Sequence, residues 1–162
     1  MQTLARGSLA GLAATAPMTL VIALGRALGL MRTPPPVQIT ANAVESAGQS
    51  PDRQSPAFQA AWLTAHFGYG AGCGAIYALA RPILPRSDTV AGVLFGGAVW
   101  TVSYMVMMPI TRLYPTAADD SRSRQAVMIA AHMVFGATLA WAERQIPAHE
   151  AGTTPRPFSR SA

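Results

Sequence analysis

Charge is scarce in this chain of 162 residues. Asp, Glu, Lys and Arg together make up 12% of it, while 51% is hydrophobic. Soluble domains carry roughly 25% charged residues, so the deficit argues against a soluble enzyme. A single cysteine, Cys73, excludes a disulfide-stapled secreted domain. The apolar content excludes intrinsic disorder over most of the chain.

Lysine is absent, so every basic side chain except histidine is an arginine, and the formal net charge is +5. A nucleic-acid partner is not expected, because the arginines form no basic patch or stripe. They stand at the ends of apolar runs instead, where a long cationic side chain can reach the membrane interface. The arginines with this placement are Arg6, Arg26, Arg53, Arg81, Arg86, Arg112, Arg124 and Arg144.

Four long windows contain no Asp, Glu, Lys or Arg. They cover residues 7–25, 54–80, 89–111 and 125–142. A helix needs about 20 mainly apolar residues to cross about 30 Å of hydrocarbon. The helices of a soluble bundle would keep a charged face, and these windows have none. The windows therefore predict membrane-spanning helices.

The predicted fold is all-α, a four-helix transmembrane bundle in a single integral-membrane domain over residues 1–145. Its helices are expected near residues 8–29, 57–80, 89–110 and 124–143. The second window contains Gln59, His66 and several glycines, so we expect that helix to be the one most enclosed by protein. Residues 146–162 are rich in Pro, Thr, Ser and Arg and predict a disordered C-terminal tail.

The first loop is the longest connection and contains three consecutive prolines at residues 34–36. Proline ends a preceding helix because it lacks the N–H donor and restricts the residue before it. Residues 37–47 then place small apolar side chains on one helical face, and Gly48 is suited to end the helix. We predict a short amphipathic helix that lies on the membrane surface or on the bundle.

Two parts of the chain share the pattern Ala-His-x-x-aromatic-Gly-Ala. It occurs at residues 65–71 and again at 131–137. The first and third predicted helices align more loosely, through residues 9–12 and 90–93. The chain is therefore predicted to contain two copies of one helical hairpin in parallel orientation.

Small residues spaced four apart allow helices to pack closely in lipid, where no hydrophobic force drives them together. Gly70 and Gly136 are predicted to serve this packing, and Pro17 is predicted to kink the first helix. Further glycine pairs with the same spacing are Gly7/Gly11, Gly25/Gly29, Gly68/Gly72, Gly70/Gly74 and Gly92/Gly96. We expect the Leu, Val and Ile side chains to face lipid.

Several segments together resemble a known family. These are ATAPMT at 14–19, PPVQIT at 35–40, HFGYG at 66–70, AVW at 98–100 followed by Ser103-Tyr104, and MIAAH at 128–132. In this order they resemble the YagU-type family of small uncharacterised bacterial inner-membrane proteins. The resemblance implies a multi-pass inner-membrane protein of unknown molecular function, with a link to survival in acid. The chain departs from the family pattern at Val37, where a basic residue would be expected.

His66 and His132 lie at a similar expected depth below the same membrane surface, and ionisable residues in a bilayer are often functional. Together with Tyr69, Ser103 and Tyr104 they form the predicted interior polar site. One interpretation is a neutral pair hydrogen-bonded to these hydroxyls or to each other. A second is a proton-responsive or solute-lining site. A third is bis-histidine haem ligation, with Gly70 and Gly136 making room for the macrocycle.

No catalytic residue, metal site or cofactor is predicted, because no carboxylate lies inside a span and no nucleophile set or metal cluster is present. We expect a non-enzymatic membrane protein that passes or senses a small solute or protons. The alternative is an accessory or structural membrane subunit. The lipid bilayer is the expected partner, with a second copy of the chain or another membrane protein left open. Six arginines fall on each side of the membrane, so their distribution does not decide orientation.

Overall fold

The computed structural model describes residues 2–116 and 119–147, and regular structure within these ranges is entirely helical. The long helices are α1 (Gln2–Ala27), α3 (Pro56–Ala80), α4 (Asp88–Val102) and α6 (Arg122–Gln145). The shorter elements are α2 (Pro35–Ser46), a 3-10 turn at Arg81–Ile83, a π-helical turn at Ser103–Met107, and α5 (Met108–Thr111). The all-α class is confirmed. Most of the predicted tail, residues 148–162, lies outside the described residues.

The helix ends follow local sequence rules. Ser55, Ser87 and Ser121 precede α3, α4 and α6, and each hydroxyl accepts a hydrogen bond from the backbone N–H three residues later, at 3.2, 3.5 and 3.3 Å. Gly48 follows α2 with φ +76°, a left-handed conformation that suits glycine. The predicted surface helix is present, and it lies on the bundle, where it contacts α3.

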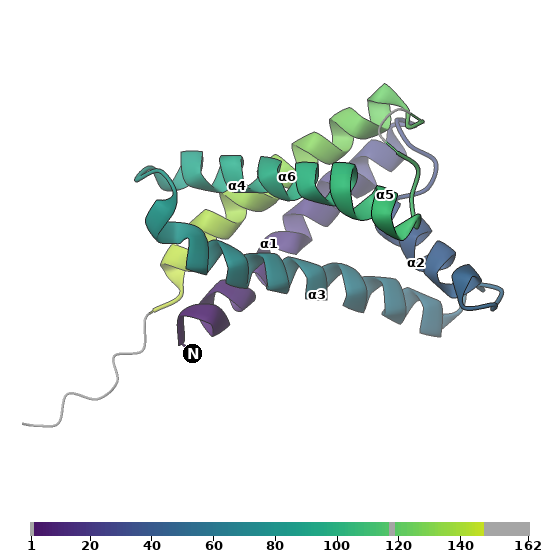
Figure 1. Cartoon of the computed structure of the whole chain (residues 1–162), viewed down its shortest axis with the longest axis horizontal. Coiled ribbons are helices and arrows are strands. Elements are labelled where there is room, and N and C mark those ends of the chain that lie inside the picture. Colours follow the sequence, from purple (N-terminus) through teal and green to yellow (C-terminus); the bar gives the residue numbers. More distant parts are fainter. Residues whose placement is uncertain (1, 117–118, 148–162) are drawn as a thin grey trace, which may run out of the picture.

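The four long helices alternate in direction along the chain (Figure 1). α1 packs against both α3 and α6, and α6 packs against both α1 and α4, so their order in space is α3–α1–α6–α4. The two outer helices, α3 and α4, meet only through side chains, for example the edge-to-face contact of Tyr77 with Phe95 at 5.2 Å between ring centroids. The bundle is therefore closely packed along α1 and α6 and more open between α3 and α4.

Glycines bring the paired helices into backbone contact. A Cβ atom on Gly11 would overlap the carbonyl oxygen of Gly70, which fixes the crossing of α1 with α3. A Cβ atom on Gly92 would overlap the carbonyl oxygen of Gly136, which fixes the crossing of α4 with α6. Gly70 and Gly136, the two glycines predicted to serve packing, lie at these crossings. Only a residue without a side chain permits these approaches.

Other predicted glycine positions differ. Gly7, Gly25, Gly74 and Gly96 also lie at helix contacts, whereas a Cβ atom on Gly29, Gly68 or Gly72 would meet nothing within 4 Å. Spacing by four residues therefore indicates helix contact only on the face that a neighbouring helix covers. Helix α1 continues through Pro17 without interruption, and the predicted kink there stays a prediction.

The large aliphatic side chains point outward. Leu20, Leu79 and Ile110 are 70%, 63% and 76% exposed, whereas Ala10, Ala14 and Ala131 are fully buried. In a water-soluble bundle this distribution would be reversed, and here it suits an exterior of lipid. Three helical stretches are long and apolar enough to cross a membrane, namely Gln2–Ala27, Asp88–Thr111 and Arg122–Gln145.

Helix α3 is long enough to cross a membrane and contains no charged residue, but its mean hydropathy is lower than that of these three stretches. The prediction that it is the most enclosed helix is wrong, since six of its residues are buried and ten of α6 are. The reason is position, because α6 lies between two helices whereas α3 lies at an edge of the bundle.

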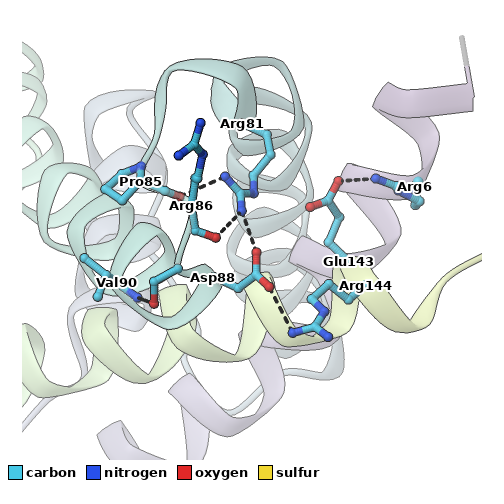
Figure 2. Close-up of polar contacts among 9 residues, drawn as sticks. Arg6, Arg81, Pro85, Arg86, Asp88, Val90, Glu143 and Arg144 are labelled. Carbon is cyan, nitrogen blue, oxygen red and sulfur yellow. Dashed lines mark hydrogen bonds and ion pairs between the residues drawn. The ribbon is translucent and has the colours of Figure 1, made fainter.

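Ion pairs join the helix ends where the α3–α4 connection lies (Figure 2). Arg6 of α1 contacts the buried carboxylate of Glu143 on α6 at 2.6 Å. Asp88, at the start of α4, accepts from Arg81 at 2.5 Å and from Arg144 at 2.9 Å. These two clusters tie the ends of all four long helices, and three arginines share two carboxylates.

The glycine crossing leads to a direct test. Gly92→Leu places a side chain against the backbone of α6 and is expected to lower the free energy of unfolding by about 2–3 kcal/mol. Gly97→Leu on the same helix is the control, because a Cβ atom there meets nothing within 4 Å. Thermal unfolding in detergent measures both variants. Equal stability of the two would contradict the crossing.

Candidate functional site

A cavity of about 310 Å³ lies where α3 and α4 part. Its volume is at the lower end of the range of small-molecule sites, about 300–1,000 Å³. Helices α1, α3, α4 and α6 contribute to its walls, and Pro35, Pro36, Ile39 and Thr40 of α2 close one side. Helix α2 is held there by Asn42, whose side-chain amide donates to the carbonyl oxygen of Leu113 at 2.8 Å.

The cavity wall is mainly apolar and aromatic. Its larger side chains are Met18, Trp62, Tyr69, Val99, Trp100, Tyr104, Met107, Met108, Tyr114, Met128 and Phe135. Among the described residues it contains no arginine or carboxylate, and no group of three His, Cys, Asp or Glu residues could hold a metal ion. Methionine adapts its shape to irregular space, so this wall can accommodate an apolar body of variable outline.

Both predicted histidines reach this cavity. His132 is 7% exposed, and its Nδ1 lies 2.7 Å from the carbonyl oxygen of Met128. A carbonyl can only accept, so Nδ1 carries the proton, and the neutral ring keeps its lone pair on Nε2. His132 therefore offers an acceptor that its own helix does not use.

His66 is half-buried, and it has the opposite tautomer. Its Nε2 lies 3.1 Å from Oγ1 of Thr19, and the Thr19 hydroxyl donates to the carbonyl oxygen of Thr15 at 2.7 Å. A hydroxyl has one hydrogen, so Thr19 accepts from His66 and the His66 proton is on Nε2. The structure gives the two histidines backbone or threonine partners rather than the expected hydroxyls of Tyr69, Ser103 or Tyr104.

Tyr69 and Ser103 bridge the parted helices. Their hydroxyl oxygens lie 2.7 Å apart, and the Ser103 hydroxyl also donates to the carbonyl oxygen of Val99 at 2.6 Å. Tyr69 therefore donates to Ser103. Ser103 begins the π-helical turn, in which the N–H of Met108 bonds to the carbonyl oxygen of Ser103. The bridge closes part of the gap between α3 and α4.

Tyr104 belongs to a buried ionic cluster that the sequence interpretation missed. Its hydroxyl donates to Asp120, whose side chain is fully buried and also binds the guanidinium of Arg124. The Asp120 carboxylate further accepts from the backbone N–H of Ser121 at 2.7 Å. The spacing of Asp120 and Arg124 by four residues is the sequence signal that could have found this pair.

An aromatic stack connects this cluster to the cavity wall. The rings of Trp100 and Tyr104 are stacked with centroids 5.5 Å apart, and Tyr114 lies 6.1 Å beyond Tyr104. The Arg124 guanidinium lies 5.4 Å from the centroid of the Tyr114 ring, in cation–π geometry. Asp120 and Arg124 therefore hold one wall of the cavity in place.

Two polar atoms of this wall are buried without a hydrogen-bond partner in the described part of the chain, Nε1 of Trp100 and the hydroxyl of Tyr114. Burial raises the pKa of Tyr114; Arg124 opposes that shift and Asp120 adds to it, so the phenol stays a neutral donor. An unpaired buried donor costs free energy, about 1–3 kcal/mol. Both atoms have almost no accessible surface, so this cost belongs to the packing of the wall.

The outward aliphatic surface and the three apolar helical stretches fit a helical membrane protein, and its bundle contains a cavity. Residues 17–141 match the family model described as protein of unknown function (DUF1440). The match covers most of the chain, which therefore belongs to this uncharacterised family. No curated protein and no solved structure matches the chain.

The ionic cluster predicts a large effect of a small change. Asp120→Asn leaves Arg124 without its counter-charge in a buried position, so the free energy of unfolding is expected to fall by about 3 kcal/mol. Asp119→Asn is the matched control, because Asp119 is exposed. Among the described residues its carboxylate accepts from the Thr116 hydroxyl alone, and its N–H donates to the Thr116 carbonyl oxygen. Thermal unfolding in detergent checks both. A similar midpoint for Asp120→Asn and the unaltered protein would refute this role.

Proposed function

We propose that this protein binds a small, largely apolar solute in the cavity between α3 and α4, and that His66 and His132 make binding responsive to protons. The role is non-enzymatic binding, sensing or passage of the solute. The observation that carries the proposal is the apolar cavity itself, whose wall is built from Met, Trp, Tyr and Phe side chains and contains no charged residue among the described residues that line it.

The chemistry of the cavity describes its occupant. His132 offers an acceptor at Nε2. The methionine and aromatic wall favours a hydrocarbon body. A mainly hydrocarbon molecule with one polar group meets both requirements.

The alternative, an accessory or structural membrane subunit that binds another membrane protein or a second copy of the chain, would be favoured by a closely packed interior. The cavity supports the solute-binding role instead. Bis-histidine haem ligation has less support. Gly136, which was expected to make room for the macrocycle, lies against Gly92 of α4, and His66 Nε2 is engaged by Thr19.

The proposal includes a multi-pass protein of the bacterial inner membrane with the YagU-type relationship that the sequence resemblance implies. It counts α3 as a fourth span, because its 25 residues are uncharged and it runs alongside α1. It also takes α1–α3 and α4–α6 as two copies of one hairpin. The equivalent crossings of Gly11 with Gly70 and of Gly92 with Gly136 support the repeat.

Fluorescence quenching tests solute binding. In a Trp141→Phe background the remaining indoles, Trp62 and Trp100, both line the cavity. A brominated alkanol, added to protein in a steroid-based detergent that lacks linear alkyl chains, is expected to quench their emission saturably. The bromine atom must reach the indole to quench it, so saturation reports occupancy of the cavity.

Paired variants of α3 make this test specific. Ala65 lines the cavity, so Ala65→Phe is expected to weaken quenching at least ten-fold in apparent affinity. Ala61 is exposed on the same helix and does not line the cavity, so Ala61→Phe should leave quenching unchanged. Quenching that rises linearly, and equally in both variants, would mean simple partitioning into detergent and would exclude the site.

The histidines predict a pH response of the same signal. Protonation of His132 removes its acceptor and adds a positive charge to an apolar cavity, so binding of the neutral alkanol should weaken as pH falls from about 6 to about 4. His132→Gln and His66→Gln each remove one titrating group and should flatten the response. Superimposable pH curves for both variants and the unaltered protein would rule out a proton-responsive role.

A further inference from the structure

A second hollow, the arginine groove, opens beside the cavity. Its volume is about 690 Å³, and it lies between the C-terminal half of α1, the start of α2 and the N-terminal half of α3. It is lined by three arginines, Arg26, Arg32 and Arg53, together with neutral residues. No carboxylate is found among the described residues that line it.

The charge of this groove is uncompensated within the described chain. Arg26, Arg32 and Arg53 are exposed and take part in no ion pair among residues 2–116 and 119–147. At the opposite ends of the same helices the arginines are paired with Glu143 and Asp88 (Figure 2). The protein therefore pairs Arg6, Arg81 and Arg144 with carboxylates at one end and leaves three unpaired arginines around a hollow at the other.

The groove and the cavity adjoin. Pro36, Trp62 and His66 line both, so His66 stands at the boundary between a cationic compartment and an apolar one. The Trp62 indole is oriented by a hydrogen bond from its Nε1 to Oε1 of Gln59 at 2.8 Å. An elongated molecule can place one end in each compartment.

We infer that the occupant of the cavity is an amphiphile with an anionic phosphate or carboxylate headgroup, held by Arg26, Arg32 and Arg53, and a hydrocarbon chain that extends past His66 into the cavity. This inference rests on the proposed function and names the class of its solute. Guanidinium groups bind phosphate and carboxylate through strong, charge-assisted hydrogen bonds. The apolar wall of the cavity suits the chain.

The quenching measurement tests this inference with probes that differ only in the headgroup. A brominated fatty acid and a brominated alkyl phosphate are compared with the brominated alkanol of the same chain length. Each anionic probe is expected to bind at least ten-fold more tightly than the alkanol, and added salt should weaken only the anionic probes. Equal affinity of anionic and neutral probes overturns the inference and leaves solute binding intact. If neither kind of probe quenches the emission saturably, both this inference and the proposed solute binding are overturned.

Arginine variants locate the headgroup. Replacing Arg26, Arg32 and Arg53 together by Gln is expected to reduce the affinity of the anionic probes to that of the alkanol, with alkanol binding unchanged. The matched control replaces Arg112 and Arg122, exposed arginines at the same end of the bundle that do not line the groove. A similar loss in the control would mean general attraction to a basic surface and would overturn the site.

Competition distinguishes the sources of the anion. Inorganic phosphate alone should displace an anionic probe only weakly, because it lacks the chain. Displacement by phosphate as strong as by an unbrominated alkyl phosphate would show an anion site without a role for the cavity and would overturn the inference. A two-chain anionic phospholipid that competes as well as the single-chain amphiphile supports it and identifies a bilayer lipid as the occupant.

Discussion

Close contact between helix backbones is the constraint on which this structure depends. Lipid surrounds the outward Leu and Ile side chains as favourably as protein would, so hydrophobic burial does not hold the helices together. Gly11 against Gly70 and Gly92 against Gly136 instead bring polar backbones into van der Waals contact. Because α1 and α6 also pack against each other, each hairpin is attached along its inner helix. The outer helices remain apart, and the cavity is the space between them.

Polar interactions hold the side of the bundle where the cavity separates α3 from α4. Asp120 and Arg124 form a buried ion pair that holds the Tyr104 hydroxyl, and Tyr104 in turn stacks on Trp100. Tyr69 reaches from α3 to Ser103 and limits how far the gap can open. A buried ion pair contributes little net stability but is costly to disrupt, so it suits a wall that must keep its shape. The cavity is thus preorganised rather than formed by an occupant.

Local rules predicted much of the fold. Proline breaks and uncharged windows located the helices, and four-residue glycine spacing located two crossings, because each signal depends on neighbours in sequence. The enclosure of α3 was predicted wrongly, since its Gln, His and Gly content reports residue type and not which helices flank it. The partners of the candidate site residues depend on pairing across the chain. His66 meets Thr19 of α1, and Tyr104 meets Asp120 across a loop, and no local pattern specifies either contact.

The π-helical turn at Ser103–Met107 has a consequence for how this segment can vary. Its N–H of Met108 bonds five residues back, so the turn contains one residue more than an α-helical turn. Removing that residue would rotate everything beyond it by about 100° about the helix axis. Met107, Met108 and Thr111 would then turn away from the space they line. Substitutions in this stretch alter the surface of the pocket, whereas a change in its length would redirect the whole wall.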